Sequence, residues 1–136
     1  MAVAATVRRI EAEGSPTDSP AAGTGVLLRR EEIALELCEG MIDLAAAFFN
    51  VSSKEMRRPG RSALAVSRVR QVAMYVAHVT LRLTMAEIGR GFGRDRKTVQ
   101  YACHAIEDLR EDSEFDGIVS QMERVATAML CNRTTG

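Results

Sequence analysis

The chain has 136 residues, 46% of them hydrophobic and 4% aromatic, and its 18 Lys and Arg balance its 18 Asp and Glu. This length suits one compact domain with an apolar core, and abundant Ala, Leu, Met, Arg and Glu favour helices over sheet. The longest apolar stretch, "LAAAFF", is too short to span a bilayer, and Arg8 and Arg9 interrupt any signal-peptide core, so we expect a cytoplasmic protein without membrane contact.

Residues 1–27 mix Ala, Gly, Ser, Thr and Pro without sustained periodicity. Such a segment buries too little apolar surface to offset the entropy of ordering it. We therefore expect a disordered arm at 1–27, a folded domain at 28–132 and a short disordered tail at 133–136.

A first helix is predicted from Glu31 to Phe49, because apolar residues recur every three or four positions. It stops at Asn50. The pattern indicates a broad buried face made of two rows, Leu35, Cys38, Ile42, Ala45 and Phe49, and Leu37, Met41, Leu44 and Phe48.

A short basic helix and loop come next. Ser52 and Glu55 have the capping-box spacing that begins a helix, and Pro59 and Gly60 prevent its continuation. Three arginines are therefore expected to project from this region: Arg57, Arg58 and Arg61.

A helix from about Ala65 to Val79 follows. Arg68 and Arg70 are expected to lie off its apolar stripe, which consists of Val66, Val69, Val72, Ala73, Val76 and Ala77.

Two helices in tandem are predicted after this. Thr84 and Glu87 again have capping-box spacing, and the helix that they begin breaks at 91–93, where glycines make positive φ accessible. Asp95 can then cap a new helix through the N–H of Lys97 or Thr98. The apolar face of that helix comprises Val99, Ala102, Cys103, Ile106 and Leu109.

A last helix, from about Glu114 to Leu130, completes the pattern and is expected to bury Phe115, Ile118, Met122, Val125 and Met129. No period-two alternation competes with these helical patterns. The sequence therefore predicts an all-α helix-turn-helix bundle of about six helices. The cysteines, Cys38, Cys103 and Cys131, are interpreted as small core residues, since an odd number in apolar surroundings argues against a disulfide framework.

A short helix, a glycine turn and a second helix with polar residues at its start are typical of a DNA-binding helix-turn-helix, whose second helix enters the major groove. Arg and Lys donate to guanine, Gln pairs with adenine, and Thr meets a thymine methyl group or a phosphate. The candidate base contacts are Arg96, Lys97 and Thr98, followed by Gln100 and Tyr101.

Charge is segregated along the chain in a way that supports this hypothesis. Residues 1–50 hold 4 Lys and Arg against 8 Asp and Glu, residues 51–111 hold 12 against 6, and residues 112–136 hold 2 against 4. The central basic surplus suits phosphate neutralisation, for which we expect Arg57, Arg58, Arg61, Arg70 and Arg94. An ordinary solvated helix face remains the alternative interpretation of the same pattern.

The helical part of the sequence resembles the C-terminal DNA-binding domain, domain IV, of the bacterial chromosomal replication initiator DnaA. Three pieces match in order: "RVRQVAMYVA" (68–77), "LTMAEIGRGFG" (83–93) and "RDRKTVQYACHAIEDL" (94–109). The family counterparts are Arg-x-Arg-Gln-x-Ala-Met-Tyr-Leu-Ala, Ser-Leu-x-Glu-Ile-Gly-x-x-Phe-Gly and Arg-Asp-His-Thr-Thr-Val-x-x-Ala-x-x-Lys-Ile. The resemblance covers roughly Glu31 to Ala128.

The resemblance implies that a signature helix reads a DNA box in the major groove while a basic-loop arginine enters the minor groove. Positions that match the signature are Arg94, Asp95, Thr98 and Val99; Arg70 and Gln71 match a pair expected near the DNA backbone, and Arg61 is the candidate minor-groove arginine.

Two departures from the family pattern bear on specificity. The family has His-Thr where this chain has Arg96-Lys97, and it has two glycines where this chain has only Gly93 before Arg94-Asp95. We therefore expect that nonspecific affinity is retained while box specificity is altered.

Nothing in the sequence indicates catalysis. The chain contains no Gly-Lys, so a phosphate loop of an ATPase is absent, and His78, His104 and Cys103 lack metal-ligand or nucleophile spacing. We expect a stand-alone relative of one domain that is not an enzyme and needs no cofactor or metal.

The predicted function is sequence-specific binding of double-stranded DNA in control of replication initiation or transcription, by a nucleoid-associated bacterial protein. The resemblance makes a monomer the default. The alternative is a protein-interaction module that binds the replication initiator or its regulators without reading DNA. In that case the row Leu37, Met41, Leu44 and Phe48 would be an exposed contact instead of core.

Overall fold

The structure, a computed structural model, describes residues 24–60 and 63–135, and within them it contains six α-helices and no strand. The predicted all-α class with about six helices is confirmed. Residues 1–23 of the predicted arm lie outside the described residues, as does Arg61. The helices are α2 (Thr24–Phe49), α3 (Ser53–Arg57), α4 (Leu64–Val79), α5 (Met85–Phe92), α6 (Arg96–Leu109) and α7 (Ser113–Thr135).

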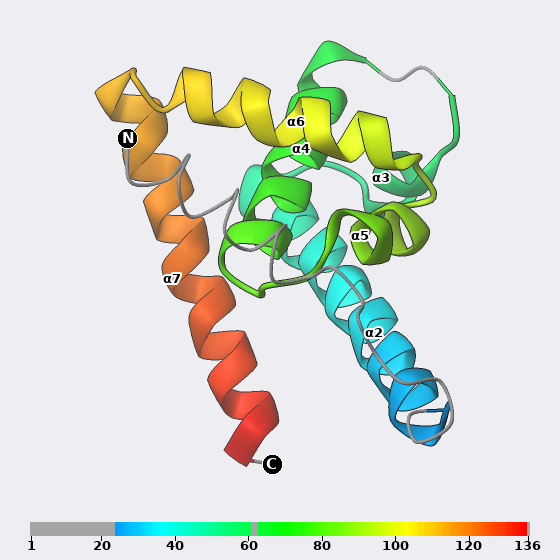
Figure 1. Ribbon diagram of the computed structural model, residues 1–136. Helices are drawn as coiled ribbons and strands as arrows, with labels where there is room; N and C mark the ends of the chain where they lie inside the picture. The colour runs from blue at the N-terminus through cyan, green and yellow to red at the C-terminus, as the bar shows by residue number, and fades with distance from the viewer. Residues whose placement is uncertain (1–23, 61–62, 136) are drawn as a thin grey trace.

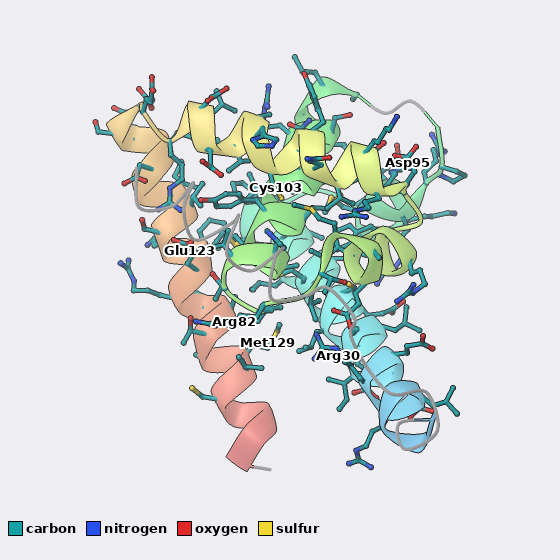
Figure 2. The ribbon with its side chains drawn as sticks, in the orientation of Figure 1. Arg30, Arg82, Asp95, Cys103, Glu123 and Met129 are labelled. Carbon is teal, nitrogen blue, oxygen red and sulfur yellow. The ribbon has the colours of Figure 1, made fainter. Side chains whose placement is uncertain are left out.

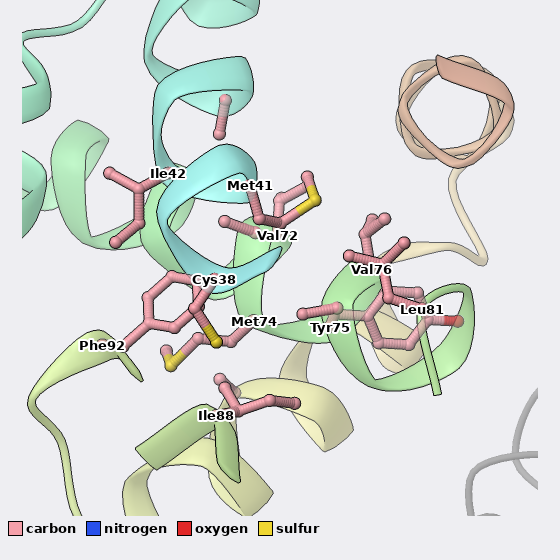
Figure 3. Close-up of a cluster of buried hydrophobic side chains, with 14 of the residues drawn as sticks. Cys38, Met41, Ile42, Val72, Met74, Tyr75, Val76, Leu81, Ile88 and Phe92 are labelled. Carbon is pink, nitrogen blue, oxygen red and sulfur yellow. The ribbon is translucent and has the colours of Figure 1, made fainter. Parts of the chain in front are cut away.

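The central element is α4, which packs against α2, α3, α5, α6 and α7 (Figure 1). Every residue from 72 to 78 is buried, so this helix meets neighbours around its circumference and not only along the predicted stripe. Cys38 and Met41 of α2 and Ile88 and Phe92 of α5 close around it (Figure 3). Because burying a large apolar side chain contributes roughly 1.5–3 kcal/mol, this cluster holds α5 firmly on the core.

The start of α5 is fixed by the predicted capping box. The Thr84 hydroxyl accepts from the Glu87 N–H at 3.1 Å, and the Thr84 N–H donates to Glu87 Oε1 at 2.9 Å. Arg30 of α2 donates to the same carboxylate, so Glu87 also ties α5 to α2. At the equivalent place in α3, the Ser52 hydroxyl accepts from the Glu55 N–H at 3.3 Å.

The first long helix differs from its prediction in length and in its buried face. It begins at Thr24, before the predicted start at Glu31, and so includes residues 24–27 of the predicted arm. Leu35 is 46% exposed and Phe48 37% exposed, whereas Leu37 and Met41 are buried. The reason is that α2 meets the body along one side only, so the outer members of both predicted rows remain in solvent. For Leu37 and Met41 the core interpretation is confirmed.

The last helix also differs from its prediction. It continues to Thr135, past the predicted end at Leu130 and through most of the predicted tail. Ile118 and Val125 are exposed, and their neighbours Val119 and Ala126 are buried instead. Apolar residues occur in adjacent pairs along this helix, so periodicity does not decide which member of each pair faces the core.

Arg110, the C-cap residue of α6, joins α7 to the core. Its guanidinium donates to Asp116 Oδ1 at 2.6 Å, to Glu123 Oε1 at 3.1 Å and to the Tyr75 hydroxyl of α4 at 3.2 Å. Burial raises the pKa of Tyr75 to about 12. The hydroxyl is therefore protonated at neutral pH, where it accepts from the charged Arg110.

No disulfide joins the three cysteines of the described residues, and two of them are core residues as predicted. Cys38 and Cys103 are buried, but Cys131 is exposed, because it lies on the part of α7 that extends beyond the body. None of the helices in the described part of the chain combines the length and apolarity that crossing a membrane requires.

Candidate nucleic-acid interface

Helices α5 and α6 form a helix-turn-helix whose turn depends on two glycines. Gly93 has φ 67°, a left-handed conformation that costs glycine least, and its N–H donates to the Gly89 carbonyl. Arg94 N also donates to the Gly89 carbonyl, at 2.8 Å. A Cβ on Gly89 would lie 2.7 Å from the Arg94 carbonyl oxygen, so only glycine allows the chain to turn back so closely.

Asp95 is the N-cap of α6, as predicted, and it uses Thr98 and not Lys97. Its Oδ1 accepts from the Thr98 N–H at 2.7 Å. Hydrogen bonds from Thr98, and then the positive charge of Lys97, lower the pKa of Asp95. The carboxylate therefore remains ionised at neutral pH, and a charged acceptor strengthens the N-cap hydrogen bond at the first turn of α6.

The polar face of α6 points away from the body. Val99, Ala102 and Cys103 are buried against the core, with Cys103 below the helix axis in Figure 2. The predicted base-contact residues all lie on the exposed side, where Tyr101 is 69% exposed: Arg96, Lys97, Thr98, Gln100 and Tyr101. Five hydrogen-bonding side chains on the first two turns have the form of a groove-reading helix start.

A basic segment, defined here as residues 53–60, lies beside the N-terminal end of α6 (Figure 1). Arg94 Nη2 donates to the Arg58 carbonyl oxygen at 2.8 Å, so the helix-turn-helix and the basic segment are in direct contact. Arg57 and Arg58 are exposed on this segment, as predicted. Together with Arg96 and Lys97 they place four exposed cations on two neighbouring elements.

Carboxylates face both arginines of the basic segment. The sequence did not predict these ion pairs. Arg57 Nη2 lies 3.4 Å from Glu39 and 3.3 Å from Asp43 of α2, and Arg58 pairs with Glu55 at 3.4 Å. Glu39 and Asp43 are four residues apart on the outer side of α2, a spacing visible in the sequence. Their approach to Arg57 follows only from the packing of α3 on α2.

The prediction that Arg70 projects to solvent is wrong. It is 5% exposed, and its Nε and Nη2 donate to the carbonyl oxygens of Met56 and Glu55 at 2.9 and 3.1 Å. The error lies in its assignment: Arg70 is four residues after Val66 and three before Ala73, so it falls on the apolar stripe. Its neighbour Gln71 is half-buried and accepts from Arg68 Nη1 at 2.7 Å.

A family model described as the bacterial dnaA protein helix-turn-helix matches residues 38–106, which is half of the chain. The chain belongs to the DnaA helix-turn-helix family. The matched region runs from α2 through most of α6 and contains the basic segment, the central helix and the helix-turn-helix. The C-terminal helix-turn-helix domain of DnaA is a DNA-binding domain and not a catalytic one.

Known replication initiators are similar in sequence and in fold. The chromosomal replication initiator protein DnaA of Mycobacteroides abscessus is 39% identical over 59 residues, which are 43% of this chain and 12% of that protein. A crystal structure of a DNA replication initiation factor superposes with a TM-score of 0.69 at 24% identity, over 77% of this chain and 32% of that one. The replication initiator DnaA bound to AMPPCP and single-stranded DNA gives 0.64 at 24% identity, over 80% and 33%.

These comparisons separate what this chain shares with DnaA from what it does not. The matched part of the chain spans only 12% of the curated DnaA relative's length. The structural likeness, at 24% identity, extends the shared fold beyond the family match at 38–106.

Proposed function

We propose that this chain binds double-stranded DNA sequence-specifically, with the start of α6 in the major groove and the basic segment on the adjacent backbone, in control of replication initiation or transcription. One observation carries the proposal. The exposed first turn of α6 and the exposed arginines of the basic segment are held side by side by the contact from Arg94 to the Arg58 carbonyl.

The chemistry of the surface suits duplex DNA. Arg96 and Lys97 can donate to guanine O6 and N7, and Gln100 can pair with adenine. Arg57 and Arg58 can each exchange a surface carboxylate for a phosphate, and salt cations then compete with them for that phosphate. The proposed partner is therefore DNA, bound by a monomer in the cytoplasm.

The proposed specificity differs from that of the standard DnaA box. Arg96 and Lys97 stand where the family has His and Thr, and both are exposed for base contact. Two long cations in the groove favour guanine-rich edges over the pattern that a shorter His-Thr pair would read.

Fluorescence anisotropy tests the proposal with two labelled duplexes, one carrying a DnaA box and one scrambled, each at two salt concentrations. We expect binding that weakens steeply with salt, since each phosphate contact contributes a slope of ~0.9 in log K against log salt. An Arg124→Ala variant removes an exposed cation from α7, outside the proposed surface, and should bind each duplex as the wild-type protein does. Binding that is absent at low salt, from a folded protein, contradicts the proposal.

The second candidate function is a protein-interaction module for the replication initiator or its regulators. The observation that favours it is a set of large apolar side chains left in solvent on α2 and α7: Leu28, Leu35, Ile118 and Val125. Failure to bind either duplex would favour this candidate.

A further inference from the structure

The backbone of the basic segment is held by two arginines from other elements. Arg70 of α4 reaches the carbonyl oxygens of Glu55 and Met56, and Arg94 of the α5–α6 turn reaches that of Arg58. The Met56 and Arg58 carbonyls lie at the end of α3 and at its C-cap, and the Glu55 carbonyl, which already accepts from the Arg58 N–H, gains a second donor. The two guanidinium groups therefore supply hydrogen bonds where the helix leaves acceptors open.

Arg70 is committed to this role by its burial. Arg70 as a whole residue is 5% exposed, and burying its charged group is favourable only where good hydrogen bonds replace the lost hydration. Arg70 and Arg94 bond the same short stretch of backbone, and burial, followed by the nearby positive charge of Arg94, lowers the pKa of Arg70. A phosphate could not reach Arg70 without displacing the basic segment.

Arg94 connects the two DNA-facing elements directly. It precedes Asp95, the N-cap of α6, and its Nη2 lies 2.8 Å from the Arg58 carbonyl oxygen. Any shift of the basic segment relative to the start of α6 must break this hydrogen bond.

We infer that Arg70 and Arg94 are positioning residues that lock the basic segment in register with the start of α6, and that they do not act mainly as phosphate contacts. The inference rests on the proposed DNA-binding function. Under this inference, Arg57, Arg58, Arg96 and Lys97 contact the DNA. Arg70 and Arg94 fix the spacing between those four side chains.

Charge-preserving variants separate positioning from direct contact. Arg70→Lys and Arg94→Lys keep the positive charge, but an ammonium group lacks the planar fork with which Arg70 spans two successive carbonyls. Arg124→Lys on α7 is the matched control, since it makes the same chemical change at an exposed position away from this surface.

Positioning predicts that both variants lose duplex affinity by roughly 3- to 10-fold and that the salt slope falls by ~0.9 for each basic-segment arginine that leaves its phosphate, although net charge is unchanged. Two amides report on the segment itself, those of Met56 and Arg58, which donate to Ser52 and Glu55. Their hydrogen exchange should become faster in both variants.

Unchanged affinity, salt slope and amide exchange in both variants would overturn the inference, as would a loss of affinity with unchanged slope and exchange. Should Arg70→Lys fail to fold, Arg94→Lys decides, because Arg94 lies at the surface and is not part of the core. Should the wild-type protein bind no duplex, the proposed function fails, and amide exchange alone decides whether the two arginines hold the segment.

Discussion

Arg30 of α2 and Glu87 of α5 form a two-point ion pair, in which Arg30 Nε and Nη2 lie 2.8 and 3.2 Å from the two carboxylate oxygens. The Glu87 side chain is almost completely buried, and the same carboxylate accepts from the Thr84 N–H that begins α5. One side chain therefore caps the first helix of the helix-turn-helix and joins it to α2.

Replacing Glu87 by Ala removes the capping box and leaves the Thr84 N–H without its carboxylate. We expect the free energy of unfolding to fall by about 2–3 kcal/mol, measured by urea denaturation. Glu31→Ala removes an exposed carboxylate from α2 and should change stability by less than ~0.5 kcal/mol. Equal effects of the two variants would show that the Glu87 contacts contribute nothing specific.

Gly91 allows α5 to cross α2 at close range. A Cβ on Gly91 would lie 2.4 Å from both Cβ and Sγ of Cys38, so Gly91→Ala must push the two helices apart. We expect a loss of about 1–3 kcal/mol in thermal or urea unfolding.

Gly117 provides the control for that variant. A Cβ there meets nothing within 4 Å, and the residue lies within α7. Gly117→Ala should therefore stabilise the protein by ~0.5–1 kcal/mol through helix propensity. If Gly91→Ala is stabilising as well, the close helix crossing is wrong.

The Cys38 thiol should make the protein less stable in alkali. Burial, and then the negative charges of Glu87 and Glu39, raise the pKa of Cys38 from 9.0 to about 12. Between these values the unfolded chain has lost the proton that the folded chain keeps. The contribution of Cys38 to the free energy of unfolding is therefore fully present below pH 9 and is lost as pH rises toward 12. The slope from this group approaches ~1.4 kcal/mol per pH unit.

Urea denaturation between pH 8 and 11 measures this slope, and Cys38→Ala is the comparison. The variant loses the thiol but keeps the Cβ, so its stability at pH 8 should drop modestly while its alkaline slope becomes shallower. Parallel pH profiles for the two proteins would exclude Cys38 as the source.

How much of this could be predicted depends on how local the determinants are. The α5–α6 turn was predictable because Thr84, Gly93 and Asp95 act within one or two turns of their own positions. The prediction for Arg70 is wrong because an arginine is expected to be exposed unless buried acceptors are known. Its acceptors are carbonyl oxygens of α3, which is distant in sequence.

The same distinction explains the acidic neighbours of the basic segment and the register of α7. The approach of Glu39 and Asp43 to Arg57 depends on how α3 packs on α2, which no periodicity encodes. Along α7, paired apolar residues satisfy two helix faces equally, and the contact with α4 selects one of them.

Glu39 and Asp43 should weaken DNA binding, because they pair with Arg57 where a phosphate would bind. A Glu39→Gln and Asp43→Asn double variant frees that charge and removes repulsion from the backbone. We expect duplex affinity to rise by roughly 2- to 5-fold with a steeper salt dependence, in anisotropy titrations. Glu114→Gln on α7 is the control, and an equal gain from it would indicate a net-charge effect alone.

The most direct test of the central claim compares duplex affinity of the wild-type protein with that of an Arg96→Ala and Lys97→Ala double variant. Both side chains are exposed on α6, so circular dichroism and melting should show an unchanged fold. We predict a loss of at least ~10-fold in affinity, as expected for two cations removed from a groove-reading helix start. Unchanged affinity in the folded double variant would contradict the assignment of α6 as the DNA-reading helix.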